Sequence, residues 1–327
     1  MSVVPMISYS YRLRQGRAAG RVRHARWLLV LLLLMVAAHL VAGCGQAGNS
    51  FSGRRAYDDV KTQISYGPRP VGSDANRRTA DYIAQTLQRA GWKVEFQDFS
   101  QGGLPIRNVI ASKGSGPLIL LGTHYDTRPV ADKDPADRSQ PVLGANDGGS
   151  GVAVLLELAR VLGAKATDQA EIRLAFFDAE DRGDLNEWDW SIGAQYAARK
   201  LDRAPSMVVI VDMVGDADQQ IYYEWNSSLS LQERIWRVAR QKGYGAYFIP
   251  TYKYAITDDH IPFIRQGYPT ALIIDFDYPV WHTTQDTLDK ISADSLQRVG
   301  NVLQTLLEGK PFAPNPVDDE PANTVQP

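Results

Sequence analysis

Histidine is scarce after residue 44 of this 327-residue chain, where it occurs only at His124, His260 and His282. A lone histidine is more often structural than chemical, so the residues around it decide the interpretation. Each of the three lies in polar, turn-rich sequence, at or after the end of a predicted strand or at the start of a predicted helix. Imidazole nitrogens in such places can bind a metal ion or move a proton, which makes these positions candidate site residues.

Carboxylates follow the same predicted strand ends. In open α/β sheets, ligands bind outside the carboxyl ends of the strands, so side chains from several strands meet at that edge. Strand ends and adjoining loops here deliver His124 with Asp126, Asp147 in a glycine-rich turn, Glu180 with Asp181, Asp212, and His282. This convergence predicts one polar site at the carboxyl edge of the sheet.

The donor types favour zinc. Imidazole and carboxylate are zinc ligands, and two histidines with three carboxylates exceed the needs of one tetrahedral ion that keeps an open position. They suit two ions that share a bridging carboxylate. In the adjacent pair Glu180–Asp181, one acid can bind metal while the other acts as general acid or base. From spacing alone, a solvated acidic loop over 178–189 explains this pair slightly better.

Strand-like and helical runs alternate and indicate a single α/β domain without internal repeats. Several strands are apolar throughout, as expected when helices cover both faces of a largely parallel sheet. The predicted strands are 94–99, 108–112, 118–121, 172–177, 207–211 and 271–274, and the predicted helices are 54–65, 74–90, 149–163, 191–202, 229–242 and 293–308.

The first 44 residues are typical of an export signal. They hold six arginines and no acid, followed by an apolar run over 27–42. At about 16 residues this run is short for a bilayer span and suits a signal peptide. Residues 41–44 (VAGC) resemble a bacterial lipobox, in which Cys44, the only cysteine, is acylated and becomes the mature N-terminus. An uncleaved signal anchor is the alternative, and either one leaves the domain on the extracytoplasmic side, anchored at the membrane.

The remaining chain divides into three parts. We expect a small, polar tether over 45–53, a catalytic domain over 54–310, and a disordered, proline-rich acidic tail over 311–327. The formal charge of -2 argues against a nucleic-acid partner, because phosphate binding needs a basic surface. The oligomeric state and the true start codon stay open.

Six segments together resemble metallopeptidase family 28, and most closely its glutaminyl cyclase branch. They are GTHYDTR (122–128), LGANDGGSGVAVLLELAR (143–160), FFDAED (176–181), VDMVGD (211–216), DDHIPF (258–263) and VWHTTQDT (280–287). The resemblance covers roughly 56–308, and the motifs occur in the family's order. It implies a zinc exopeptidase-like fold, a three-layer sandwich with a mixed, largely parallel central sheet flanked by helices.

The resemblance also implies roles for individual residues. Asp147 would bridge two zinc ions, one held with His124 and Asp212 and the other with Asp181 and His282. Glu180 would be the catalytic carboxylate, and Asp126 would orient His124. Many relatives carry glutamate where this chain has Asp181, which is one methylene shorter; some bacterial members of the cyclase-like branch share the shorter acid.

Two reactions on peptide or protein N-termini stay open: cyclisation of an N-terminal glutamine with release of ammonia, or hydrolysis by a two-zinc aminopeptidase. Similarity to cyclases favours the first, through an acid network of Asp258 with Glu180 and Asp212, and through substrate contacts assigned to Trp281, Trp190 and His260. The five filled metal positions and the GANDGGSG loop favour the second. A binding module on an inactive scaffold is a third possibility, against which the intact Glu180 argues. Whether one or two zinc ions bind stays open.

Overall fold

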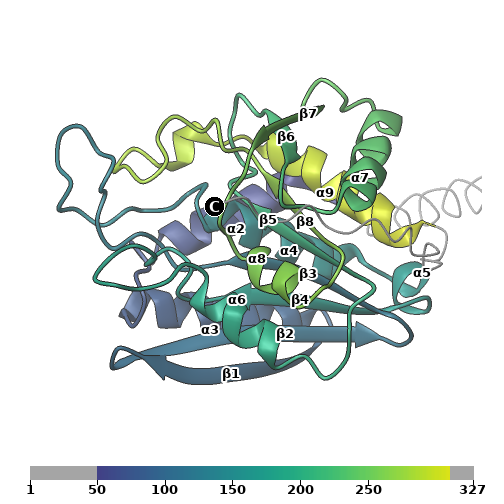
Figure 1. Ribbon diagram of the computed structural model, residues 1–327, viewed down its shortest axis with the longest axis horizontal. Helices are drawn as coiled ribbons and strands as arrows, with labels where there is room; N and C mark the ends of the chain where they lie inside the picture. Colours follow the sequence, from purple (N-terminus) through teal and green to yellow (C-terminus); the bar gives the residue numbers. More distant parts are fainter. Residues whose placement is uncertain (1–49, 310–327) are drawn as a thin grey trace, which may run out of the picture. The chain divides into compact units, whose positions relative to one another are not determined.

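The computed structural model describes residues 50–309, and its centre is a six-stranded mixed sheet in the order β1-β2-β4-β3-β5-β8 (Figure 1). Strands β3, β4, β5 and β8 run parallel, while β2 is antiparallel to both β1 and β4. The strands are β1 (Lys93–Gln101), β2 (Leu104–Gly114), β3 (Leu118–His124), β4 (Glu171–Phe177), β5 (Met207–Asp212) and β8 (Thr270–Ile274).

Helices cover both faces of this sheet. The larger hydrophobic core lies under α2 (Gly53–Ile64), α3 (Asp74–Arg89), α4 (Gly149–Val161), α7 (Leu229–Gln241) and α9 (Ala293–Glu308). The smaller core on the other face lies under α6 (Ile192–Arg199) and α8 (Ile261–Arg265). The predicted three-layer sandwich is therefore confirmed, because β3, β5 and β8 are buried along their whole length.

Several short elements lie outside the predicted pattern. They are α5 (Ala164–Thr167), the 3-10 helix η1 (Leu288–Lys290), and a separate parallel pair of strands, β6 (Ile221–Glu224) and β7 (Phe248–Tyr254). The pair is joined through α7, and its register shifts between Tyr222 and Glu224. Strand β7 is largely exposed beyond Phe248, so it lacks the apolar run that marks the central strands.

The folded domain begins earlier than the predicted boundary at residue 54. Phe51 is 4% exposed and lies in the larger core, and a Cβ at Gly300 of α9 would lie 2.2 Å from its ring. Ser52 caps α2 by accepting a hydrogen bond from the Arg55 amide. Residues 51–53 therefore belong to the domain and not to a tether.

The predicted signal peptide, Cys44, most of the tether and the tail from 311 lie outside the described residues. Within residues 50–309, none of the helices combines the length and apolar character that crossing a bilayer requires.

Candidate metal centre and active site

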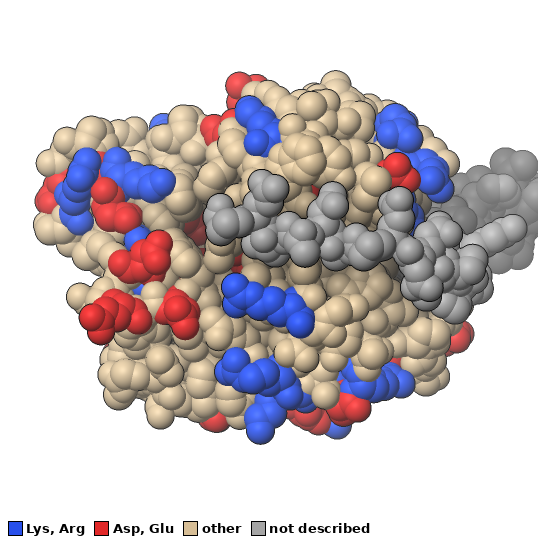
Figure 2. Space-filling view, in the orientation of Figure 1, with Lys and Arg blue, Asp and Glu red and all other residues tan. Residues whose placement is uncertain are grey.

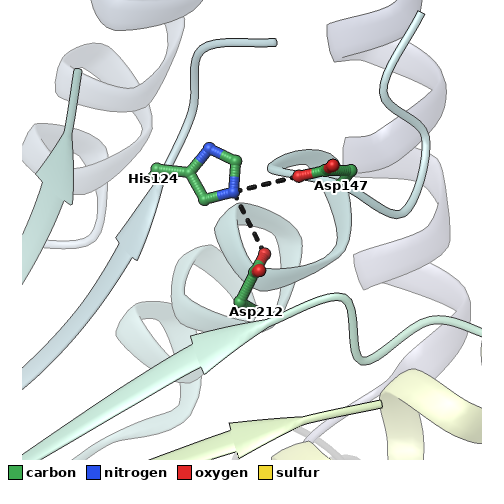
Figure 3. A group of neighbouring side chains, drawn as sticks. All are labelled: His124, Asp147 and Asp212. Carbon is green, nitrogen blue, oxygen red and sulfur yellow. Dashed lines mark hydrogen bonds and ion pairs between the residues drawn. The ribbon is translucent and has the colours of Figure 1, made fainter. Parts of the chain in front are cut away.

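The first donor triad comes from three separate segments at the carboxyl edge of the sheet (Figure 3). His124 ends β3, Asp212 ends β5, and Asp147 lies in the loop before α4. The His124 Nε2 atom lies 3.1 Å from Asp212 Oδ1 and 3.2 Å from Asp147 Oδ1. One donor atom from each residue falls within 4.8 Å of the other two, which is the spacing that a shared cation needs.

A second triad uses the other oxygen of the same aspartate. His282 Nε2 lies 2.9 Å from Asp181 Oδ1 and 3.6 Å from Asp147 Oδ2. These donors also lie within 4.8 Å of one another. Asp147 therefore stands between two groups of ligands, as a bridging carboxylate between two metal ions would.

The donors fit zinc. Asp147 Oδ2 and Asp181 Oδ2 are buried without a hydrogen-bond partner among the described residues, and such atoms are costly unless a cation or another polar group satisfies them. Each triad supplies one imidazole and two carboxylates, a set that zinc accepts, and leaves a position for water or substrate. The structure thus brings together all five ligands that the sequence predicted.

Two aspartates, Asp126 and Asp132, contact the segments that carry the candidate metal ligands. Asp126 accepts hydrogen bonds from the amides of Glu180 and Asp181, both at 3.1 Å, and its Oδ1 lies 3.6 Å from His124 Nδ1. Asp132 lies 3.2 Å from His282 Nδ1 and also binds Arg128. A carboxylate behind a metal-bound imidazole fixes its orientation and raises its basicity. The sequence predicted that Asp126 orients His124; in the structure Asp126 makes no hydrogen bond to His124 Nδ1 and instead holds the Glu180–Asp181 segment. Sequence reasoning missed Asp132.

The loop that carries Asp147 is held by two further residues that sequence reasoning missed. Asp286 accepts hydrogen bonds from the amides of Asn146 at 2.9 Å and Asp147 at 3.1 Å. Arg69 is fully buried and donates to the carbonyls of Tyr125, Leu143 and Gly144, at 3.0, 2.9 and 2.8 Å. Its guanidinium joins the chain after β3 to the loop before α4. Burial lowers the pKa of Arg69 to about 10, so it stays charged at neutral pH.

Glycines let the loop and α4 approach the strands closely. A Cβ at Gly151 would lie 2.2 Å from Thr123 Oγ1 and 2.5 Å from the Val211 carbonyl. Gly148 has φ +73, and a Cβ there would lie 2.7 Å from the Asp126 carbonyl. Glycine is therefore required at position 151 because a side chain would not fit, and at position 148 because of the backbone conformation.

Several residues at the carboxyl edge of the sheet have strained backbone conformations. Ala179, Met213 and His282 are non-glycine residues with φ of 61, 43 and 57°. Ala179 directly precedes Glu180, Met213 directly follows Asp212, and His282 is itself a candidate ligand. Such conformations cost of order 1–3 kcal/mol each and persist where surrounding contacts impose them, as the hydrogen bonds of Asp126 do here.

A cavity of about 200 Å³ opens beside both triads. Its lining includes Asp147, Glu180, Asp181, Trp190, Asp212, Asp258, Phe276, Trp281 and His282. Both indoles lie near the His282 ring: the Trp190 ring is nearly parallel to it at a centroid distance of 6.2 Å, and the Trp281 ring is tilted at 4.0 Å. On the face shown in Figure 2, basic and acidic side chains both occur.

Glu180 and Asp258 line this cavity and belong to neither triad. Burial, opposed by His124 and reinforced by Asp259 and Asp258, holds the pKa of Glu180 well above its usual range. Burial and the charge of Asp212 raise the pKa of Asp258 to about 7. Asp258 can therefore take up and release a proton near neutral pH, and the carboxylate of Glu180 is a stronger base than an ordinary glutamate.

The prediction that His260 contacts substrate is wrong. His260 is fully buried, does not line the cavity, and lies with Nε2 3.3 Å from the carboxylate of Glu224. It stands at the N-terminal end of α8, where the chain turns, so its side chain points into the protein while that of Asp258 reaches the cavity. Trp190 and Trp281 do line the cavity, as predicted, whereas Trp188 packs in a small separate cluster.

The model of peptidase family M28 matches residues 108–307. The chain belongs to peptidase family M28. Among solved structures, this family member is similar to Porphyromonas gingivalis glutaminyl cyclase, with 35% identity, a TM-score of 0.75, and coverage of 80% of this chain and 99% of that one.

Two further relatives bear on the chemistry of this M28 protein. A Zn-dependent exopeptidase from Parabacteroides distasonis shares 32% identity with a TM-score of 0.75, over 80% of this chain and all (100%) of that one. The glutaminyl-peptide cyclotransferase-like protein of Mus musculus is 29% identical over 280 residues, 73% of this chain and 71% of the mouse protein. Family membership and the donor set together assign zinc as the cofactor of this site.

Proposed function

We propose that this protein is a zinc-dependent glutaminyl-peptide cyclotransferase, which converts the N-terminal glutamine of peptides to pyroglutamate and releases ammonia. The observation that carries the proposal is the composition of the cavity. Two carboxyl groups that bind no metal, Glu180 and Asp258, face a space bounded by Trp190 and Trp281 beside His282. Such a space offers a proton carrier and aromatic walls for a folded glutamine side chain beside the metal-binding residues.

The reaction forms one bond and breaks one. The α-amine nitrogen of the substrate attacks the side-chain amide carbon, a C–N bond closes the five-membered ring, and the bond to the amide nitrogen breaks. Bound zinc supplies a Lewis acid that polarises the amide carbonyl. Glu180 accepts the proton that the amine loses and returns it to the departing nitrogen, which leaves as ammonia. Because attack is intramolecular, correct folding of the side chain provides much of the acceleration.

The residues around Glu180 position it and favour its protonated form during the proton transfer. Asp126 fixes the backbone of Glu180, and the hydroxyl of Ser191 lies 3.4 Å from Glu180 Oε1. The charges of Asp258 and Asp259 disfavour the ionised form of Glu180, which allows Glu180 to hold a proton transiently. Trp190 and Trp281 provide apolar walls beside the space where the amide would react.

A two-zinc aminopeptidase is the second candidate, and the complete pair of triads sharing Asp147 favours it. In that reaction Glu180 would take a proton from water, and the N-terminal residue would be released as a free amino acid. The same residues serve both reactions, so the products distinguish them.

A direct comparison of products tests the proposal. The purified protein is given Gln-peptides and, separately, Leu- and Ala-peptides of the same length, and ammonia and free amino acids are measured. We expect ammonia from the Gln-peptides to be released faster than any amino acid. Faster release of leucine or alanine would assign the protein to the aminopeptidases.

We also propose that the protein is exported in a bacterium and held at the membrane by acylation of Cys44. The basic residues, the apolar run over 27–42 and the VAGC sequence support this. Growth with a labelled fatty acid should label the protein, and Cys44→Ser should lose the label and the membrane association. A Cys44→Ser protein that stays labelled or membrane-bound would contradict the proposal.

A further inference from the structure

Trp190 holds a defined place in the cavity lining. Its ring plane makes an angle of 15° with that of His282 at a centroid distance of 6.2 Å. The guanidinium of Arg128 lies 5.1 Å from the centre of the indole. The backbone carbonyl of Trp190 accepts a hydrogen bond from Gln195 at 3.0 Å. The indole is thus fixed from several directions while it stays partly open to the cavity.

Gly183 lies directly beneath this indole. A Cβ at Gly183 would lie 2.1 Å from Trp190 Cδ2, 2.4 Å from Cγ and 2.6 Å from Cε3. These atoms lie at or near the base of the ring system, so a small rotation of its far end cannot relieve the overlap. The backbone of Gly183 is outside the left-handed region, which means that conformation alone does not require glycine here.

The backbone of Gly183 is held in place. Its amide donates to the Glu180 carbonyl at 3.3 Å, and its carbonyl accepts from Arg128 Nη1 at 2.7 Å. The same arginine donates to the carbonyl of Asp181 at 3.2 Å. Because Arg128 joins this segment to the face of Trp190, a side chain at 183 would displace the indole before it displaced the backbone.

We propose that Gly183 is a specificity-determining position of this enzyme: the absence of a side chain there lets Trp190 line the cavity, and recognition of the N-terminal residue depends on that contact. The inference rests on the proposed function only for the identity of the substrate. A planar amide side chain of glutamine can lie against the indole face; contacts between two aromatic rings, taken as the guide to its strength, contribute about 0.5–1.5 kcal/mol, roughly two- to ten-fold in affinity.

A double-mutant cycle tests the proposal. Gly183→Ala and Trp190→Ala are made singly and together, with Gly245→Ala as the matched control, since a Cβ there meets only the flexible Arg240 side chain at 3.3 Å. We expect each single change to raise the KM for a Gln-peptide roughly two- to ten-fold, with kcat and zinc content little changed. In the Trp190→Ala background, Gly183→Ala should have no further effect, because the overlap is gone.

Several outcomes would overturn the assignment. A KM for Gly183→Ala equal to that of the Gly245→Ala control would do so, and so would fully additive effects in the double variant. If Gly183→Ala alone fails to fold, the double variant decides: recovery of folding supports the contact with Trp190, and continued unfolding refutes it.

The near-ultraviolet circular dichroism of the tryptophan bands provides a readout that needs no activity. Gly183→Ala should change it in the wild-type background and leave it unchanged once Trp190 is alanine. If the wild-type protein releases amino acids and no ammonia, the proposed function fails, and the same cycle is measured with the peptide that is cleaved. The two failures are therefore distinguishable.

Discussion

Replacing Glu180 by glutamine separates proton transfer from metal binding. The Glu180 side chain is 6% exposed and belongs to neither donor triad. Glutamine has nearly the same shape, and its carbonyl oxygen can accept the hydrogen bond that the Ser191 hydroxyl donates at 3.4 Å. Folding and the ligands should therefore be preserved, while the side chain loses the ability to take up and release a proton.

The expected loss is large. A positioned general acid–base contributes about 10²–10⁴ in rate, which corresponds to about 3–5.5 kcal/mol of transition-state stabilisation. Burial holds the pKa of Glu180 well above its usual range, with Asp259 and Asp258 adding to the shift. A raised pKa makes the carboxylate of Glu180 a stronger base than an ordinary glutamate. We therefore expect kcat to fall about 10³–10⁴-fold.

The assay follows ammonia release from a Gln-peptide and measures the zinc content of each purified variant. Glu187→Gln is the control, because Glu187 is an exposed acid seven positions further along the same loop and should keep full activity. Loss of zinc together with the rate would make Glu180 a ligand, and a loss of rate below about ten-fold would remove it from the proton-transfer step.

Three further predictions follow from the same contacts. A chelator should abolish activity and zinc should restore it; full turnover in metal-free buffer would contradict the assignment. Asp132→Asn should weaken zinc binding by about 10–100-fold, because Asp132 lies 3.2 Å from His282 Nδ1. Asp137→Asn, in the same loop, is the control and should leave the zinc Kd unchanged. Equal Kd values for the two variants would exclude the role of Asp132. Burial raises the pKa of Asp275 to about 7 from an ordinary value of 3.8, so the folded state binds the extra proton between these values and stability falls as pH rises through that window. Asp275→Asn, which can still accept from the Gln220 amide, should therefore have a larger free energy of unfolding than wild type at pH 8, by up to about 4 kcal/mol, and show little gain at pH 4. Denaturant titrations at both pH values measure this, and an equal gain at both would refute the titration.

The sequence predicts the central elements well because their signals are local. Runs such as 207–211 are apolar at every position, and helix caps such as Ser73 and Ser292 stand directly before amphipathic stretches. The ligands were found for a related reason. Each follows a strand or opens a helix, so the topology of a parallel sheet brings them to one edge.

The missed features depend on contacts between distant parts of the chain. Asp132 lies in a loop without periodicity, and only the folded loop brings it to His282. Arg69 precedes the site by more than fifty residues and acts through backbone carbonyls, which leave no pattern in the sequence. His260 was misplaced because adjacency to Asp258 in one motif does not fix the direction of a side chain at a turn.

The place where the chain enters the domain bears on how an anchored enzyme could work. The Ser52 amide donates to Glu157 at 3.0 Å, and Glu157 lies eight residues, about 12 Å, along α4 from the end that carries the Asp147 loop. A pull on the upstream segment is therefore applied to the packed helices α2, α4 and α9 and not to the strained loops around the zinc ligands. If the protein is anchored through Cys44, as proposed, tension along the chain would reach this helical layer before it reached the loops that carry Asp181, Asp212 and His282.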